Sequence, residues 1–334
     1  MKAYVQDAIG SYGERDLEPP RPGPGEVILK MRAALTCGTD LKLLSRGHPR
    51  IALPATMGHE LCGEVAALGD GVAGWKLGER VVPGVSGPCG HCRECRAGRE
   101  NLCPSAHADR TWGAFADRVR VPAAVVASSL HRVPAGLDDE VAAFLDPLAS
   151  VLHGWSRLRE PRGAVLVYGA GALALLWAAV ASRRGLAVIV AGRRPERASL
   201  AERFGARFVR VDGGGAPELA ESADLAVDAT GDARVWERLP FLVRPGGQVL
   251  LFGGCAPGAA VTFDAARLHY AEITLSGAFH YAPRDAREAL EALASGEVDP
   301  RPLIAGRGPL SALPGFLDAQ ARGAGVRYAV RGDA

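Results

Sequence analysis

The sequence predicts an α/β protein with two domains, one rich in β-strands and one built on a doubly wound parallel sheet. The chain has 334 residues, which is long for one ordinary domain and suits two. Short strand-like segments separated by Gly and Pro fill its first part, and buried strands then alternate with helices. We expect residues 1–147 and 281–334 to form the β-rich domain, and residues 148–280 the doubly wound domain.

The β-rich part begins at the first residues of the chain. Met1–Val5 has a strand-like pattern, Glu26–Met31 alternates in polarity, and Val81–Gly84 ends another strand. Dense Gly and Pro mark the turns between these segments. The pattern becomes helical near Asp139, which marks the approach to the second domain.

The second part alternates between strands and helices. A buried strand, Ala164–Tyr168, precedes a glycine-containing turn and a long apolar helix that continues through Ala181. Further buried strands are expected at Ala187–Ala191, Leu225–Asp228, Gly247–Phe252 and Glu272–Gly277. Alternation of this kind predicts a parallel sheet with helices on both faces. A helix from about Pro283 to Ser295 and a strand near Val326–Val330 would return to the first domain.

Composition restricts the class of partner. The 39 basic and 37 acidic residues give a net charge of +2, which favours neither nucleic acid nor a membrane surface as a partner. No apolar run approaches the roughly 20 residues that span a bilayer, and no signal peptide is evident. We therefore expect a cytoplasmic protein that binds small molecules.

Four of the seven cysteines lie within fifteen residues, in the order C-x2-C-x2-C-x7-C. They are Cys89, Cys92, Cys95 and Cys103. Four thiolates from one short loop can fill every position of a tetrahedral zinc ion, which leaves none for substrate. In a cytoplasmic protein, metal ligation is a better interpretation than disulfides. The spacing predicts a structural zinc site.

A dinucleotide fingerprint follows the strand Ala164–Tyr168. Gly169 permits a tight turn, Gly171 lets the backbone approach a pyrophosphate, and Ala174 stands where the third glycine of the pattern is found. The N-terminus of the next helix offers unpaired N–H groups to phosphates. This context predicts binding of a nicotinamide dinucleotide.

The end of the second strand bears on the choice of cofactor. NAD enzymes place an acid there to bind the ribose 2′-hydroxyl, whereas this chain has Gly192 followed by Arg193 and Arg194. A small residue leaves room for a 2′-phosphate, and guanidinium groups can bind it. The segment favours NADP(H) over NAD(H).

Several ordered motifs resemble one known family. In chain order they are Cys37–Asp40, Gly58–Gly63 with Gly69 and Val72, Gly78–Val81, the four cysteines and Asp146–Leu148. The second motif has the form GHExxG-x5-G-x2-V. The chain resembles zinc-dependent medium-chain dehydrogenases of the alcohol and polyol type, close to sorbitol and threonine dehydrogenases. The resemblance runs nearly end to end, and it implies a GroES-like catalytic domain with a zinc lobe and a Rossmann domain.

The resemblance also implies a second, catalytic zinc ion. Such an ion needs about three protein ligands and one exchangeable position, and Cys37 and His59 are the firmest candidates. Glu60 is a direct ligand in polyol-type relatives, although the corresponding carboxylate swings away in others. Asp146 would reach the metal directly or through water. Asp40 is expected to accept a hydrogen bond from the other nitrogen of His59.

The implied reaction is hydride transfer between an alcohol or ketone and the nicotinamide. Thr39 would begin a proton relay, and Lys42 stands where many relatives carry the His that ends it. Thr230 and Gly253 resemble the strand ends that border the nicotinamide.

The substrate predicted from the resemblance is a secondary alcohol or ketone of a polyol, sugar or cyclitol. Threonine-like amino acids and simple secondary alcohols are the alternatives. A zinc-free quinone or enoyl reductase and a non-enzymatic NADPH-binding regulator are more distant ones. The resemblance also implies a homodimer or a homotetramer.

Overall fold

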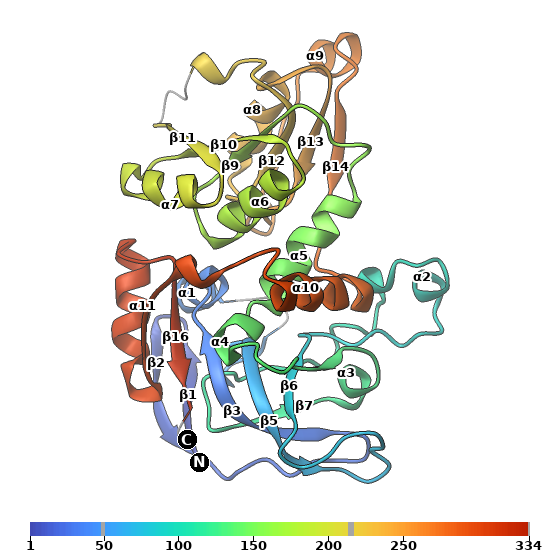
Figure 1. Ribbon diagram of the computed structural model, residues 1–334, viewed down its shortest axis with the longest axis vertical. Helices are drawn as coiled ribbons and strands as arrows, with labels where there is room; N and C mark the ends of the chain where they lie inside the picture. The colour runs from blue at the N-terminus through green and yellow to red at the C-terminus, as the bar shows by residue number, and fades with distance from the viewer. Residues whose placement is uncertain (48–50, 213–216, 333–334) are drawn as a thin grey trace. The chain divides into compact units, whose positions relative to one another are not determined.

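The computed structural model describes residues 1–47, 51–212 and 217–332. The chain divides into two compact units, Met1–Ala149 with Ala282–Ala334, and Ser150–Tyr281 (Figure 1). The first unit is therefore made from two separate stretches of sequence, and the second from the stretch that lies between them. The first is rich in strands and the second alternates strands with helices, which confirms the α/β fold class.

Strands form the framework of the first unit, and most of their pairings are antiparallel, although β15 pairs with β16 in parallel. They are β1 (Lys2–Ala8), β2 (Ser11–Asp16), β3 (Val27–Leu35), β4 (Ala55–Thr56), β5 (Glu60–Leu68), β6 (Arg80–Pro83), β7 (Arg118–Val121), β8 (Leu130–Arg132), β15 (Ile304–Pro309) and β16 (Arg327–Arg331). The larger sheet has the order β15-β16-β3-β5-β6-β8, with β7 also paired to β3. Strand β16 runs antiparallel to β3, with Ala329 opposite Leu35. The last strand of the chain is thus adjacent to one of the first.

Helices of the first unit pack around these strands. They are α1 (Gly38–Arg46), α2 (Arg93–Arg96), α3 (Ala123–Ser128), α4 (Asp139–Ala142), α10 (Pro283–Ser295) and α11 (Leu313–Arg322), and α5 (Leu145–Ser156) continues across the unit boundary. The core contains Leu29, Met31, Leu61, Phe115 and Val330, all nearly inaccessible to solvent. Burial of such side chains contributes about 2 kcal/mol each.

Two consecutive acids of α4 link strands that are distant in sequence. Asp139 accepts hydrogen bonds from Arg32 and Arg80, each at 2.8 Å. Glu140 accepts from Arg307 and Arg331, each at 2.6 Å. The second pair attaches β15 and β16 to the N-terminal segment of the unit.

The second unit alternates strands with helices. Its elements are β9 (Ala164–Tyr168), α6 (Ala172–Arg183), β10 (Ala187–Gly192), α7 (Ala198–Arg203), β11 (Ala206–Arg210), β12 (Ala223–Asp228), α8 (Ala233–Arg238), β13 (Val243–Leu251), α9 (Ala265–Tyr270) and β14 (Thr274–Gly277). Six described strands form a parallel sheet in the order β11-β10-β9-β12-β13-β14. This is the Rossmann order, in which ligands bind at the carboxyl ends of the strands.

Most predicted elements lie within two residues of their expected positions, and the helix Pro283–Ser295 has the predicted bounds. The last strand of the parallel sheet begins at Thr274 and not at Glu272. Glu272 has a φ of 51°, which a strand does not accommodate. Among the described residues, no helix is both long and apolar enough to cross a bilayer.

Candidate metal centres and nucleotide site

Three buried side chains of the first unit form a potential metal site. Cys37 immediately precedes α1, His59 immediately precedes β5, and Glu60 is the first residue of β5. One ligand atom from each lies within 4.8 Å of the others. The predicted ligands Cys37, His59 and Glu60 are therefore brought together.

The backbone at His59 is held by a close approach of two segments. Gly58 has a φ of 88°, and its carbonyl accepts hydrogen bonds from Gly113 at 2.9 Å and Ala114 at 3.1 Å. A Cβ at Gly58 would lie 2.8 Å from the Phe115 ring. A side chain here would require the core to move, so the glycine before the histidine has a packing reason.

Sequence reasoning missed a buried arginine at this site. Arg327 of β16 donates from Nη2 to Glu60 Oε1 at 2.9 Å and from Nη1 to the Thr36 carbonyl at 2.6 Å. The side chains of Arg327 and Glu60 are 2% and 1% exposed. The one available signal was an arginine inside the otherwise apolar strand Val326–Val330.

The charge of Arg327 affects the cysteine and the carboxylate beside it. Burial raises the pKa of the Cys37 thiol, but the charge of Arg327 and the hydrogen bond and charge of His59 outweigh it, so that pKa falls well below its ordinary value. Burial raises the pKa of Glu60 well above its ordinary value, although Arg327 opposes this shift. Arg327 thus favours the thiolate that a metal requires.

His59 lies between an acid and an aromatic ring. Its Nδ1 is 3.7 Å from Asp40 Oδ1, which exceeds hydrogen-bond length. The other oxygen of Asp40 accepts a hydrogen bond from the Cys37 N–H at 2.7 Å. The indole of Trp112, which sequence reasoning also missed, stacks on the imidazole with 5.0 Å between ring centroids and 5° between planes. Asp40 therefore positions Cys37 directly.

The donor set fits a zinc ion. Glu60 Oε2 is buried without a hydrogen-bond partner, and a buried carboxylate oxygen without a partner is costly. A thiolate, an imidazole and a carboxylate are the ligand types that zinc prefers. Three protein ligands also leave an exchangeable position.

Three further residues are predicted from the sequence to act at this site, one as a metal ligand and two in the proton relay. Asp146 on α5 is half-buried and is not among the three clustered side chains, although its charge contributes to the raised pKa of Glu60, for which burial is the main cause. Thr39 is half-buried in the first turn of α1, and Lys42 is exposed one turn later.

The four clustered cysteines also have metal-site geometry. Their Sγ atoms are separated by 3.5 Å (Cys92 to Cys95), 3.6 Å (Cys103 to Cys89) and 4.0 Å (Cys89 to Cys95). A tetrahedral zinc ion with bonds of about 2.3 Å requires about 3.8 Å between sulfurs. The observed separations bracket that value, so the lobe fits a closed zinc site.

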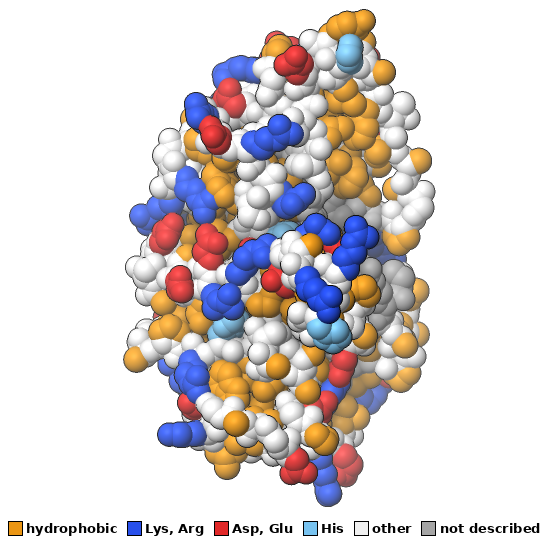
Figure 2. All heavy atoms as spheres, turned by 90° about the vertical axis from the view of Figure 1, so that its right-hand side faces the viewer, with side chains coloured by type: hydrophobic (Ala, Val, Ile, Leu, Met, Phe, Trp, Pro, Cys, Tyr) orange, Lys and Arg blue, Asp and Glu red, His pale blue; other side chains and the backbone are white. Residues whose placement is uncertain are grey.

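Backbone N–H groups contact the sulfurs of this cysteine lobe, and its loop carries three arginines. Cys103 Sγ accepts a hydrogen bond from the Cys89 N–H at 3.4 Å, which helps bring the pKa of Cys103 to about 6 even though burial raises it. Arg93, Arg96 and Arg99 are exposed. Basic side chains gather where the lobe faces the viewer in Figure 2. Arg99 is paired with Glu94 at 2.7 Å, which leaves Arg93 and Arg96 as the cations nearest in sequence to the cysteines without an ion pair among the described residues.

The dinucleotide fingerprint has its expected local structure in the second unit. Gly169 has a φ of 124°, and a Cβ there would lie 3.3 Å from the Ala229 backbone. Gly171 caps α6, and a Cβ there would meet no atom within 4 Å. Ala174 is buried. The open space at Gly171 beside the helix N-terminus fits a pyrophosphate.

Gly192 ends β10 and has a packing reason of its own. A Cβ there would lie 2.7 Å from the Ala170 Cβ. Any side chain at this position would therefore require the turn to move. This packing favours glycine over an acid independently of which cofactor binds. Arg193 and Arg194 follow as exposed side chains.

The strand ends near Thr230 and Gly253 are joined through Asp228. Its carboxylate accepts hydrogen bonds from Thr230 Oγ1 at 2.6 Å and Trp236 Nε1 at 2.8 Å, and its carbonyl accepts one from the Gly253 N–H at 2.8 Å. Asp228 is fully buried. The two loops are thus held together at the carboxyl end of the sheet.

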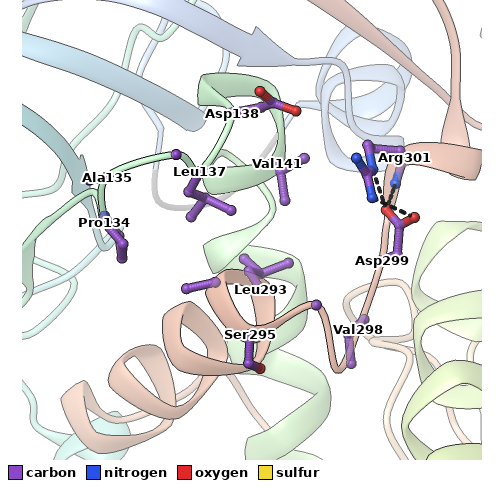
Figure 3. A pocket seen from close by; sticks show the side chains of 13 residues that line it. Pro134, Ala135, Leu137, Asp138, Val141, Leu293, Ser295, Val298, Asp299 and Arg301 are labelled. Carbon is purple, nitrogen blue, oxygen red and sulfur yellow. Dashed lines mark hydrogen bonds and ion pairs between the residues drawn. The ribbon is translucent and has the colours of Figure 1, made fainter.

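A cavity of about 320 Å³ lies in the first unit, and none of the candidate site residues lines it. Leu137, Val141 and Leu293 point toward one another there (Figure 3). At the edge of the cavity, Arg301 donates a hydrogen bond to Asp299 at 2.8 Å, so these two charges balance each other.

Comparison with known families matches most of the chain. Residues 23–134 match the family described as alcohol dehydrogenase GroES-like domain, and residues 172–295 match the family described as zinc-binding dehydrogenase. The two matched ranges contain the candidate metal centres and part of the nucleotide fingerprint.

Individual proteins are similar over nearly their whole length. L-threonine 3-dehydrogenase of Streptomyces avermitilis is 32% identical and D-altritol 5-dehydrogenase of Agrobacterium fabrum 33% identical, covering 92% and 88% of this chain and of each relative. Among solved structures, the alcohol dehydrogenase of Thermus sp. ATN1 has a TM-score of 0.89 at 26% identity, over 99% of both chains. A protein of Sinorhizobium meliloti described as a zinc-binding dehydrogenase, solved with NADP, has a TM-score of 0.86 at 29% identity and covers 99% of this chain and 98% of its own.

Proposed function

Because the chain belongs to the zinc-dependent medium-chain dehydrogenase family, we propose that it transfers a hydride between NADP(H) and a secondary alcohol or its ketone. The observation that carries this proposal is the buried group of Cys37, His59 and Glu60. Its donors suit zinc, and it leaves one coordination position for substrate. In this proposal Cys37 and His59 are direct ligands, Glu60 is a ligand whose charge Arg327 balances, and Asp146 acts directly or through water.

A bound zinc ion would polarise the substrate carbonyl and stabilise negative charge on the oxygen in the oxidising direction. The residues around it have separate roles. Asp40 fixes the Cys37 backbone through its 2.7 Å hydrogen bond, and Trp112 covers one face of the His59 ring. Arg327 donates to Glu60 Oε1, the oxygen that lies 3.9 Å from His59 Nε2, and Glu60 Oε2 has no hydrogen-bond partner.

Thr39 would exchange the hydroxyl proton of the substrate in this proposal. Its position two residues after Cys37, in the first turn of α1, supports the role. Replacing Thr39 by Val should lower hydride transfer by more than about tenfold, whereas a change within about threefold would exclude an essential hydroxyl. Ser45→Ala is the matched control, because Ser45 is an exposed hydroxyl of the same helix.

The proposed cofactor is NADP(H), with NAD(H) the alternative. The exposed pair Arg193 and Arg194 after β10 supports it, as does the NADP found in the Sinorhizobium meliloti relative. Kinetics with NADP+ and NAD+ test this choice. Equal or better kcat/KM with NAD+ would contradict it.

The proposed substrates are secondary alcohols of polyols, sugars or cyclitols. Similarity to D-altritol 5-dehydrogenase supports this class, and similarity to L-threonine 3-dehydrogenase supports an amino-acid substrate as the second candidate. A screen over polyols, cyclitols, threonine and simple secondary alcohols separates the two. Turnover of threonine alone would favour the second candidate.

We also propose a structural zinc in the cysteine lobe, giving two ions per chain, and a homodimer or homotetramer. The sulfur separations of the lobe support the second ion. Metal analysis of the purified protein should find about two zinc ions per chain. Absence of zinc would instead favour a zinc-free reductase. Bound NADPH without turnover of any substrate would favour a regulator.

A further inference from the structure

Arg210 is an exposed cation at the carboxyl end of the parallel sheet. It ends β11, and the strand register places it opposite Gly192, which ends β10. The Val211 N–H donates to the Gly192 carbonyl at 3.0 Å, so the pairing extends to the strand ends. Among the described residues, the Arg210 side chain has no ion pair or hydrogen bond.

Arg210 lies on the face of the sheet that meets the glycine turn. A Cβ at Gly192 would lie 3.1 Å from the Phe208 ring and 2.7 Å from the Ala170 Cβ, so these two side chains share its face. Ala170 lies between the two glycines of the fingerprint. Phe208 and Arg210 are two residues apart on β11, and alternate residues of a strand point to the same face. Arg210 therefore follows Phe208 on the face of the turn, one step closer to the strand ends.

Arg193 and Arg210 differ in whether a nearby acid offsets their charge. Asp232 forms a two-point pair with Arg234, at 3.1 and 2.8 Å. The hydrogen bond from Arg234 is the main reason that the pKa of Asp232 is lowered, and the charge of Arg193 contributes. Arg193 thus lies within the field of an acid, whereas Arg210 forms no ion pair with any residue that the structure describes.

We propose that Arg210 binds the 2′-phosphate of NADP(H) together with the arginines that follow Gly192, and so determines cofactor specificity from the neighbouring strand. This inference rests on the proposed function in assuming that a dinucleotide binds at the glycine turn. Gly192 contributes no side chain of its own, and Ala170 and Phe208 occupy the space beside it, so Arg210 is the next side chain of β11 beyond Phe208 on this face. A guanidinium group without an acidic partner is well suited to a phosphate dianion.

Calorimetric titration of the full chain with adenosine 2′,5′-bisphosphate and with 5′-AMP tests the inference without turnover. Arg210→Ala should weaken binding of the bisphosphate by about tenfold or more and leave 5′-AMP within about twofold. Arg207→Ala is the matched control, because Arg207 is an exposed arginine of the same strand whose odd spacing places it on the opposite face. That control should change neither affinity.

The outcomes separate the inference from the cofactor proposal. If the wild-type protein prefers the bisphosphate and Arg210→Ala keeps that preference, Arg210 is not part of the site, while NADP(H) remains the cofactor. Equal loss in Arg207→Ala would also overturn the inference, because a general field effect would explain both. If the wild-type protein shows no preference for the bisphosphate, both proposals fail.

Discussion

Arg327 Nη2 lies 2.9 Å from Glu60 Oε1, and the two side chains form a buried ion pair beside the candidate ligands Cys37 and His59. The arginine comes 267 residues after the glutamate. A buried pair of this kind contributes little net stability, but loss of one partner leaves an uncompensated charge.

Replacing Arg327 by Met should therefore be costly. We expect the free energy of unfolding to fall by about 3–5 kcal/mol, because Glu60 would remain buried without its cation. The double variant Arg327→Met with Glu60→Gln should lose much less than the sum of the single variants. Denaturant titrations of the four proteins measure this coupling, and additive losses would contradict the pairing.

Replacing Gly171 should affect dinucleotide binding without affecting stability. Its φ is −88° and a Cβ there would meet no atom within 4 Å, so Gly171→Ala should leave the unfolding free energy within about 0.5 kcal/mol of wild type. The added methyl group would meet a bound pyrophosphate, so dinucleotide affinity should fall by about tenfold or more. Gly169→Ala, by contrast, should lower both the unfolding free energy and the dinucleotide affinity. Gly169 has a φ of 124°, which a residue with a side chain rarely adopts. Unchanged nucleotide affinity in Gly171→Ala would argue against binding at this turn.

Substitution of one cysteine of the lobe should remove the zinc ion there without affecting the other metal centre. Cys103→Ser is expected to lower the zinc content by about one ion per chain, since a closed site needs all four thiolates. Cys255→Ser is the control, because Cys255 lies outside both groups of candidate ligands and should leave the zinc content unchanged. Elemental analysis gives the answer directly, and full zinc content in Cys103→Ser would disprove this ligand set.

His131 should make the protein sensitive to acid. Burial chiefly, with the charge of Arg287, lowers the pKa of His131 from its ordinary value of 6.5 to about 4. The unfolded chain therefore binds a proton more readily than the folded one, and stability is lost as the pH falls through this interval. His131→Gln should remove about 2 kcal/mol of the stability difference between pH 7 and pH 5, as measured by denaturant unfolding. An unchanged pH dependence would contradict the shift.

Glu140 should matter more for stability than Arg331, one of the two arginines that it binds. Glu140→Gln weakens two hydrogen bonds of 2.6 Å at a buried carboxylate, and we expect a loss of about 1–2 kcal/mol. Arg331→Ala should cost less than about 1 kcal/mol, because that side chain is 58% exposed. Thermal unfolding of the two variants measures these losses. A larger loss in Arg331→Ala than in Glu140→Gln would refute the expectation.

Local sequence patterns predicted much of this molecule because its main motifs are local. The cysteine quartet comes from a single loop, and the glycine turn is defined by its strand and helix, so spacing alone indicates their geometry. Arg327 and Trp112 could not be found in this way. Their places depend on strand pairing and on a loop that returns to His59, which no local pattern encodes. The lack of an acid at Gly192 is visible in the sequence, but its close packing against Ala170 depends on how the turn folds over the strand.

The position of Arg327 in β16 has a consequence for biosynthesis. A ribosome makes the chain from its N-terminus, so Cys37, His59 and Glu60 exist long before the strand that carries the balancing cation. Until β16 joins β3, Glu60 has no balancing cation, although the pairing of β3 with β5 already places Leu35 opposite Glu60. The charge balance of this centre should therefore be completed late in synthesis, whereas the cysteine lobe can take up its ion as soon as its own loop has emerged.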